Sequence, residues 1–313
     1  MKQSKVRDGV FGFCVGDALG VPVEFLSRSS LTKDPVEDMI GYGSHSQPAG
    51  TWSDDSSLLF CLMESAALYP QIDLVDLADR FTKWYKEGYW TPHGVVFDVG
   101  IATAEAIGRF KQHCIRPDFA GGADEYSNGN GSLMRILPLA YLLKDESFED
   151  RAAIIAQVSS LTHRHRVSII ACVMYVELTL HLLEGATPSE SVSRMRETIL
   201  SAYGYEERQV MARFDRLLKD DLAALPMEDI ESSGYVIHTL EASIWSLLTT
   251  ESYKDAVLRA VNLGDDTDTT GAVTGGLAGI YYGLESIPAE WINDLARLGD
   301  IEDLCRRFEA VAG

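Results

Sequence analysis

Apolar residues recur at three- and four-residue spacing through most of this 313-residue chain. After Ser53, for example, Leu58, Leu59, Leu62 and Met63 would share one face of a helix. The spacing also predicts helices at residues 5–20, 73–87, 95–112, 132–143, 148–160, 166–184, 188–203, 206–224, 235–250, 252–263, 268–283, 288–297 and 301–311. Strand-like alternation is nearly absent. We therefore expect an all-α fold, with residues 1–313 forming one compact domain of many helices.

The segments between these helices are polar or contain turn-forming residues. Gly20 and Pro22 end the first helix, and the loops 26–52 and 115–130 are rich in Ser, Gly, Asn and Pro. Residues 204–233 are acidic and mixed in pattern, so we expect a peripheral insertion there. The longest uncharged run, residues 269–284, is too short and too glycine-rich for a membrane span. The N-terminus has no convincing signal peptide.

Residues 261–283 are the most informative stretch of the chain, because an acidic start leads directly into a glycine-rich helix. Gly271, Gly275, Gly279 and Gly283 recur at every fourth position and fall on one helical stripe. Each glycine in a helix interior costs about 1 kcal/mol against alanine. Four in register indicate that another backbone packs closely against this helix.

The composition argues for a globular protein and against two classes of binding partner. Apolar residues make up 46% of the chain, and 47 acidic residues against 27 Lys and Arg leave a formal charge of −20. That charge argues against binding nucleic-acid backbones or anionic membranes, both of which require clustered cations. The cysteines are scattered and typical of reduced, buried thiols in a cytoplasmic protein; they are Cys14, Cys61, Cys114, Cys172 and Cys305.

Two predicted helix starts carry clustered carboxylates with a neighbouring hydroxyl. The first is Ser53-Asp54-Asp55, and the second is Asp266-Thr267-Asp268-Thr269, preceded by Asp265. Such acids cap helices and interact favourably with the helix dipole, but one or two would suffice for that role. Grouped oxygen donors favour Mg²⁺, Mn²⁺ or Ca²⁺ over structural zinc. Four carboxylates carry about −4 and two helix N-termini return about +1, which two divalent ions would offset.

Other polar stretches could bind a ligand. The run Asn128-Gly129-Asn130-Gly131-Ser132 is either an ordinary turn or a flexible backbone whose free amides suit a pyrophosphate. Thr162 to Arg166 could cap a helix, or His163 could hydrogen-bond a ribose. Tyr235 could cover a base. Gly16-Asp17 through Glu24 is either a helix cap or part of a site.

Seven motifs, taken in order, resemble those of the ADP-ribosylglycohydrolase family; they are GDALGVPVE, WSDDSS, FDVG, NGNGSLMR, LTHRH, SGYVIHTLEA and NLGDDTDTTGAVTGGLAG. The resemblance spans about residues 5–290. It implies two Mg²⁺ or Mn²⁺ ions held by Ser53, Asp54, Asp55, Asp266, Asp268 and Thr269. Ser53 stands where well-known members more often have threonine, and Asp265, where many have glycine, is not implied as a ligand.

The resemblance also implies the roles of residues outside the metal stretches. Glu24 matches a glutamate of a mobile loop, and Asp98 in FDVG matches an acid near the scissile bond. The residues matching the ADP-ribose pocket are Asn128, Gly129, Asn130, Gly131, Ser132 and His163, with Tyr235 a looser match facing adenine.

The implied activity is metal-dependent hydrolysis of the bond between ADP-ribose and an acceptor, with ADP-ribosylated arginine on a protein as the first choice. Asp55, Asp98 and Glu24 all stay open as the proton-transferring acid. One alternative is another ADP-ribose linkage, such as serine-linked or O-acetyl-ADP-ribose. Another is a non-catalytic protein that binds ADP-ribose or a partner.

Overall fold

The computed structural model describes residues 5–69, 71–110, 116–203 and 207–312, and within these ranges it contains helices and isolated β-bridges but no β-strand. The all-α prediction is therefore confirmed. The α-helices are α1 (Lys5–Gly20), α2 (Arg28–Leu31), α3 (Asp54–Leu68), α4 (Leu74–Glu87), α5 (Ile101–Phe110), α6 (Pro138–Leu142), α7 (Phe148–Ser160), α8 (Arg166–Leu183), α9 (Pro188–Ala202), α10 (Arg208–Met211), α11 (Asp215–Lys219), α12 (Val236–Leu248), α13 (Tyr253–Val261), α14 (Thr267–Tyr282), α15 (Ala289–Asp294) and α16 (Leu298–Ala312).

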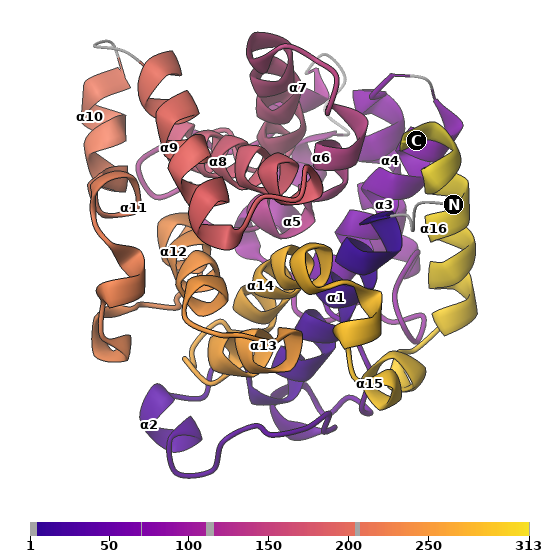
Figure 1. Cartoon of the computed structure of the whole chain (residues 1–313). Helices are drawn as coiled ribbons and strands as arrows, with labels where there is room; N and C mark the ends of the chain where they lie inside the picture. Colours follow the sequence, from indigo (N-terminus) through magenta and orange to yellow (C-terminus); the bar gives the residue numbers. More distant parts are fainter. Residues whose placement is uncertain (1–4, 70, 111–115, 204–206, 313) are drawn as a thin grey trace.

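Helices α1 and α14 lie side by side in the middle of the molecule (Figure 1). The glycine stripe of α14 faces glycines of α1, and a Cβ atom on Gly275 would overlap the carbonyl oxygen of Gly12. A Cβ on Gly271 would lie 2.5 Å from the Gly16 carbonyl oxygen. The expected close backbone contact is confirmed for these positions. Gly283 instead ends the helix, with φ of 85°.

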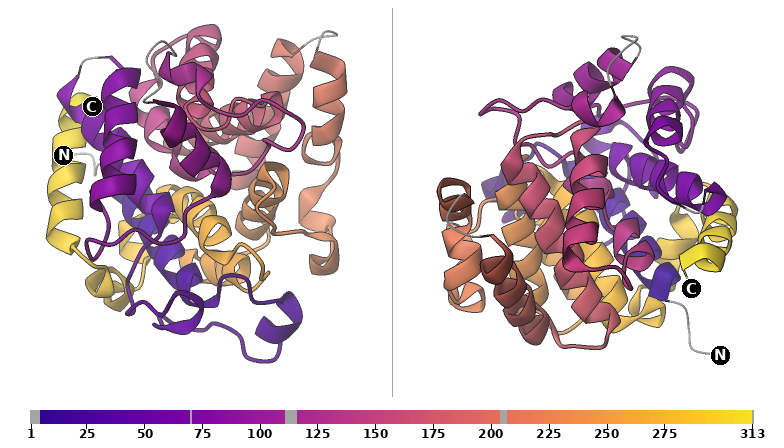
Figure 2. Two further views of the ribbon diagram at one scale, coloured as in Figure 1. Left: turned by 180° about the vertical axis from the view of Figure 1, so that it is seen from behind. Right: turned by 90° about the horizontal axis from the view of Figure 1, so that it is seen from above.

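The other helices surround this pair (Figures 1 and 2). Helices α8, α12 and α13 pack against α14, and α3 contacts both α1 and α14. Helix α16 packs along α3. By length and composition α8 could cross a membrane, with a mean hydropathy of 1.6, but 83% of it is buried inside the molecule. It is a core helix here.

Two predicted helices are shorter or broken near the cavity described below. Residues 95–100 are not helical, because Asp98 adopts a left-handed φ of 48° and α5 begins only at Ile101. Positions 111 and 112 of the prediction lie outside the described residues. The predicted helix 132–143 divides into a 3₁₀ turn, η4 (Leu133–Arg135), and α6, which begins at Pro138. Proline lacks the N–H that a continuous helix requires.

The predicted helix 206–224 was also wrong in its continuity. Position 206 lies outside the described residues. From Arg208 to Lys219 the chain stays helical as α10, the 3₁₀ turn Ala212–Phe214 and α11, and this stretch ends because Asp220 takes an extended conformation. Residues Leu222–Ala224 form a separate 3₁₀ turn. Helices α10 and α11 lie at one edge of the molecule (Figure 1). Their apolar side chains still reach the core, with Phe214 and Leu217 fully buried. The loop 26–52 contains the short α2 and a 3₁₀ turn, η2 (Gly43–His45).

The core is almost continuous, as one domain requires. The four described cysteines, Cys14, Cys61, Cys172 and Cys305, are buried free thiols, as expected. Cys114 lies outside the described residues. Burial raises the pKa of the Cys61 thiol well above its ordinary value, so it is inert as a nucleophile at neutral pH.

Gly275→Ala should destabilise the protein by about 1–3 kcal/mol, because the added methyl forces α1 and α14 apart and outweighs alanine's better helix propensity. Gly108→Ala is the matched control. Gly108 is exposed in α5, and a Cβ there would meet nothing within 4 Å, so this change should stabilise by up to about 1 kcal/mol. Urea unfolding measures both. Equal stability of Gly275→Ala and the wild type would contradict the close-packing interpretation.

Candidate active site

The N-termini of α3 and α14 meet inside the molecule. Ser53 caps α3, and its hydroxyl oxygen accepts a hydrogen bond from the backbone N–H of Asp55 at 3.2 Å. From α14, the Thr269 hydroxyl donates to Asp55 Oδ1 at 3.4 Å, across 214 positions of sequence. The two oxygen-rich stretches predicted from the sequence therefore form one site.

Asp17 of α1 holds the start of α3 in place. Its carboxylate accepts hydrogen bonds from the backbone N–H of Ser53 at 2.9 Å and of Ser56 at 3.0 Å, and from the Ser56 hydroxyl at 2.6 Å. By sequence, Asp17 stands within a stretch that is either a helix cap or part of a site. An acid inside an apolar helix was the available signal, and the fold shows that it caps α3 rather than its own helix.

The carboxylates approach one another closely enough to share cations. One oxygen from each of Asp17, Asp55 and Asp268 lies within 4.8 Å of the others, and the same holds for Glu24, Asp266 and Asp268. Asp268 belongs to both groups. Its Oδ2 is buried and has no hydrogen-bond partner in the described part of the chain. An unpartnered buried carboxylate oxygen beside other oxygen donors fits a hard divalent cation.

Burial and mutual repulsion make ionisation of this cluster unfavourable without a cation. Burial, then the charges of neighbouring acids, raise the pKa values of Asp54, Asp55 and Asp268 well above their ordinary range. Burial also raises the pKa of Glu24 to about 9. Burial raises the pKa of Asp266 too, although hydrogen bonds led by that from Asn130 oppose the shift.

A cavity of about 430 Å³ opens beside the carboxylates. No lysine or arginine contributes to its lining within the described residues. The predicted site residues that line it are Glu24, Asp54, Asp98, Gly129, Asn130, Gly131, His163, Asp266 and Thr269. Ser53, Asp55 and Asp268 are buried next to these residues but do not line the cavity.

Three residues predicted to bind ADP-ribose lie outside the cavity lining. Ser132 is fully buried and accepts a hydrogen bond from the Ser159 hydroxyl. The Asn128 side chain donates to the Glu125 carbonyl oxygen. Tyr235 is half-buried beside the lining residue Gly234. These three residues therefore support the loops around the cavity in this conformation.

The glycine- and asparagine-rich loop is tied to α12 and to the acid cluster. The Asn130 backbone N–H donates to the Gly234 carbonyl oxygen at 3.0 Å, and its side-chain amide donates to Asp266 Oδ2 at 2.7 Å. The Ser168 hydroxyl donates to the Gly129 carbonyl oxygen. The Asn-Gly run, for which the sequence allows either an ordinary turn or a flexible ligand-binding backbone, is thus hydrogen-bonded against the carboxylates.

Glu24 and Asp98 meet at the cavity together with His45, a residue that the sequence analysis left inside a loop. One ligand atom from each of the three lies within 4.8 Å of the others, and His45 Nε2 hydrogen-bonds Glu24. The His45 ring packs between Phe25 and Phe97, with centroid distances of 5.9 and 5.2 Å. A lone histidine in a Ser- and Gly-rich loop was the available signal, but its partners lie in two other segments.

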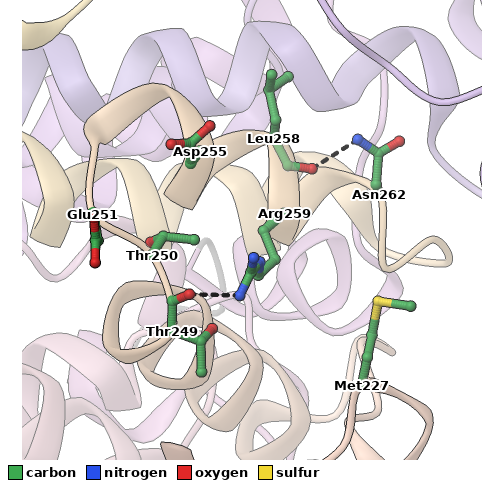
Figure 3. Close-up of a pocket in the computed structure, with 8 residues that line it drawn as sticks. All are labelled: Met227, Thr249, Thr250, Glu251, Asp255, Leu258, Arg259 and Asn262. Carbon is green, nitrogen blue, oxygen red and sulfur yellow. Dashed lines mark hydrogen bonds between the residues drawn. The ribbon is translucent and has the colours of Figure 1, made fainter.

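A second cavity, of about 530 Å³, lies where α13 meets the end of α12, and it shares no lining residue with the first (Figure 3). Two of its polar side chains donate hydrogen bonds to backbone carbonyl oxygens. Arg259 donates to the Thr249 carbonyl oxygen at 2.6 Å, and the Asn262 amide donates to the Leu258 carbonyl oxygen at 2.8 Å (Figure 3). The chemistry-bearing residues therefore belong to the first cavity.

Comparison with known proteins agrees with this geometry. The family model for ADP-ribosylglycohydrolase matches residues 1–313. The chain belongs to the ADP-ribosylglycohydrolase family. It is similar to ADP-ribosylarginine hydrolase Tri1 from Pseudomonas putida, with 31% identity covering 97% of this chain and 77% of the relative. The same-named protein of Serratia proteamaculans is 29% identical, over 97% of this chain and 78% of the relative.

Two further matches extend the family relationship. An ADP-ribosyl-[dinitrogen reductase] glycohydrolase from Rhodospirillum rubrum is 28% identical over 91% of this chain and 87% of the relative. A solved structure of an ADP-ribosylglycohydrolase-related protein complex has a TM-score of 0.82 and 32% identity, covering 99% of this chain and 98% of that one. The family resemblance of the seven motifs is confirmed. This family member is a hydrolytic enzyme with ADP-ribosylglycohydrolase activity, and its carboxylate cluster fits a metal site.

The metal-free protein should show a pH dependence that comes from Asp17. An unfolded aspartate has a pKa near 3.8, and burial raises the pKa of Asp17 to about 6 in the folded protein. The folded state thus binds this proton more tightly. The Asp17 contribution to the free energy of unfolding should therefore fall as pH rises from about 4 to about 6, by at most about 1.4 kcal/mol per pH unit.

Urea unfolding in chelator from pH 4 to pH 7 measures this contribution, with Asp17→Asn as the reference that lacks the titrating group. The stability of the wild type relative to the variant should decrease across that window. A relative stability that increases with pH would show that the pKa of Asp17 is lowered, not raised.

Proposed function

We propose that this protein removes ADP-ribose from arginine side chains of proteins, using two divalent ions, Mg²⁺ or Mn²⁺. The observation that carries the proposal is the junction of the α3 and α14 N-termini beside the cavity, with Asp268 Oδ2 buried and without a hydrogen-bond partner among the described residues. The residues proposed to hold the ions are Ser53, Asp54, Asp55, Asp266, Asp268 and Thr269. When bound, such ions would orient vicinal ribose hydroxyls and a water.

The charge of the cavity supports a cationic acceptor. Glu24 and Asp98 line it without any described lysine or arginine, and burial raises the pKa of Glu24 to about 9. A guanidinium group beside them would stabilise their ionised forms and gain charge-assisted hydrogen bonds. The relatives named ADP-ribosylarginine hydrolase support the same linkage. Serine-linked ADP-ribose and O-acetyl-ADP-ribose present no such cation.

The chain's own residues supply the remaining chemistry in this proposal. As the bond from C1″ to the acceptor breaks, positive charge develops on the sugar, and nearby carboxylates stabilise it. The departing nitrogen takes a proton, and the attacking water loses one. Asp55, Asp98 and Glu24 are the candidate acids for these transfers. The loop formed by residues 128–132 would hold the ADP-ribose against the acid cluster.

A panel of ADP-ribosylated arginine, ADP-ribosylated serine and O-acetyl-ADP-ribose tests the substrate class. We expect release of ADP-ribose from the arginine substrate at the highest kcat/KM. Preference for either oxygen-linked substrate would reassign the acceptor. Binding of ADP-ribose with no turnover of any of the three would favour a non-catalytic role.

Neutralising Asp266 should reduce turnover by about 100-fold or more, since the change removes an anionic metal-binding oxygen donor from the centre of the site. Asp265→Asn is the matched control, because Asp265 is exposed and lies next in sequence. Asp266→Asn should also lose the rise in melting temperature that Mg²⁺ or Mn²⁺ gives the wild type. Full wild-type turnover after thorough chelation would refute the two-metal proposal.

Glu24→Gln should slow hydrolysis by about 10²- to 10⁴-fold, while the affinity for ADP-ribose changes little. Glutamine keeps the size and a hydrogen-bonding oxygen but cannot transfer the proton. Glu37→Gln is the control, an exposed glutamate in the loop that follows. Single-turnover rates and calorimetric affinities separate the two effects. Unchanged turnover would mean that Glu24 is only a structural loop residue.

A further inference from the structure

Arg135 is a fully buried cation with no carboxylate partner among the described residues. Its guanidinium group lies over the Phe81 ring, with 5.0 Å from Cζ to the centroid. Its N–H groups donate to the Gly131 carbonyl oxygen, to the Val158 carbonyl oxygen at 3.3 Å, and to Thr162 Oγ1 at 2.7 Å. Burial lowers the pKa of Arg135 to about 10, so it stays protonated at neutral pH. The Thr162 hydroxyl oxygen therefore accepts a hydrogen bond from a group that can only donate.

Thr162 passes a hydrogen bond on to His163. The threonine side chain is fully buried, and its hydroxyl lies 2.8 Å from His163 Nδ1. Arg135 and His163 are the only side-chain groups that hydrogen-bond this hydroxyl within the described chain. Because a guanidinium only donates, the hydroxyl accepts from Arg135, and its own proton is free for Nδ1.

Counting donors and acceptors distinguishes the two neutral forms of His163. With the proton on Nε2, Nδ1 accepts from Thr162, so the threonine hydroxyl and Nδ1 both have their partners. With the proton on Nδ1, two donors would point at the threonine oxygen, and its buried hydroxyl proton would have no acceptor among the described residues. Burial lowers the pKa of His163 to about 3, so the ring is neutral in either case.

The other edge of the His163 ring reaches the cavity. His163 lines the cavity wall, and no hydrogen bond to its Nε2 occurs within the described residues. The ring lies against Gly129 and Gly131, where a Cβ atom would come to 3.4 Å from Nε2 and 2.6 Å from Cε1 respectively. The absence of a side chain at Gly131 leaves room for the ring, and Nε2 is left for a ligand.

We propose that Arg135 and Thr162 act as positioning residues that hold His163 in the Nε2–H tautomer, so that a neutral N–H donor points into the cavity. It would donate to an acceptor oxygen of the bound ligand, either a phosphate oxygen or a ribose oxygen. The identity of that ligand as ADP-ribose rests on the proposed function. The tautomer itself rests only on the contacts within the protein.

The tautomer can be read directly by ¹⁵N NMR of histidine-labelled protein without any ligand. The chain has seven histidines, and His163→Gln identifies the signals of His163 by their loss. We expect a protonated Nε2 and an unprotonated Nδ1 for His163 in the wild type at neutral pH. An Nδ1–H form, or a comparable mixture of both forms, in the wild type would overturn the proposal without requiring any variant to fold.

Thr162→Val and Thr162→Ser test the relay. Valine keeps the shape but removes the hydroxyl, so the preference for the Nε2–H form should be lost. Serine keeps the hydroxyl, so Thr162→Ser should retain the preference for the Nε2–H form. Retention of the wild-type tautomer in Thr162→Val would show that the hydroxyl does not set it.

Calorimetric titration with ADP-ribose and with ADP tests the contact to the ligand. Thr162→Val should weaken ADP-ribose binding by about tenfold, and Thr162→Ser should restore it. His165→Asn, which keeps a helix-capping side chain at the next histidine, should bind as the wild type does. Weakening of both ligands places the accepted oxygen in the ADP part, and weakening of ADP-ribose alone places it in the distal ribose; both support the contact.

Unchanged ADP-ribose affinity in a Thr162→Val protein that has lost the tautomer would overturn the donor role of His163. If the wild type bound no ADP-ribose at all, the proposed function would fail, and the NMR measurement would still decide whether the relay exists.

Discussion

The close packing of α1 against α14 is the contact on which the site depends. Opposing glycines let the two backbones meet, and this contact continues to the end of α1, where a Cβ atom on Gly20 would overlap the backbone of Asp268. The Thr267 hydroxyl donates to the Gly20 carbonyl oxygen at 2.7 Å at the same point. A wider separation of the helices would therefore move Asp17 and Glu24 away from Asp268. The glycines thus set the distance between the carboxylates of the two helices.

The same packing creates an electrostatic cost that the fold does not offset by itself. Carboxylates from α1, α3 and α14 are buried within reach of one another, and burial raises the pKa of each of Asp17, Asp54, Asp55 and Asp268. The N-terminal dipoles of α3 and α14 return only part of the missing positive charge. Hydrogen bonds from Ser53, Ser56 and Asn130 orient the carboxylate oxygens but add no net charge. Bound cations would supply the remainder.

Uncharged hydrogen-bonding groups and the buried Arg135 cation hold the part of the cavity wall formed by residues 129–131 and His163. Arg135 keeps its guanidinium group in the core and is connected to the cavity wall through the Gly131 carbonyl oxygen and through Thr162 and His163. The cavity lining thus combines carboxylates with uncharged polar groups of residues 129–131 and His163. Such a lining suits a ligand that carries both oxygen acceptors and a cationic group.

Local sequence determined much of this protein. Helical periodicity alone predicts α1 and α7 at their observed bounds. The Ser53 cap and the Asp266–Thr269 stretch can also be recognised in the sequence, because capping and oxygen-donor chemistry act between near neighbours. The family resemblance adds Glu24, Asp98 and the Asn130 loop. Residues 95–100 are misread as helix because Asp98 adopts a left-handed conformation, and the predicted helix 206–224 ends early, at Lys219, because Asp220 is extended. Periodicity encodes neither conformation.

Only the tertiary structure decided which segments meet. The glycine stripe of α14 predicts that another helix packs closely against it, but it does not predict that this helix is α1. Asp17, His45 and Arg135 act on residues from other segments, so their roles depend on contacts formed after the chain has folded. Ser132 shows the converse, since its place in a ligand-binding motif does not prevent its side chain from facing the core. Spacing along the chain specifies chemistry within one turn of a helix, and packing between helices specifies which groups share a site.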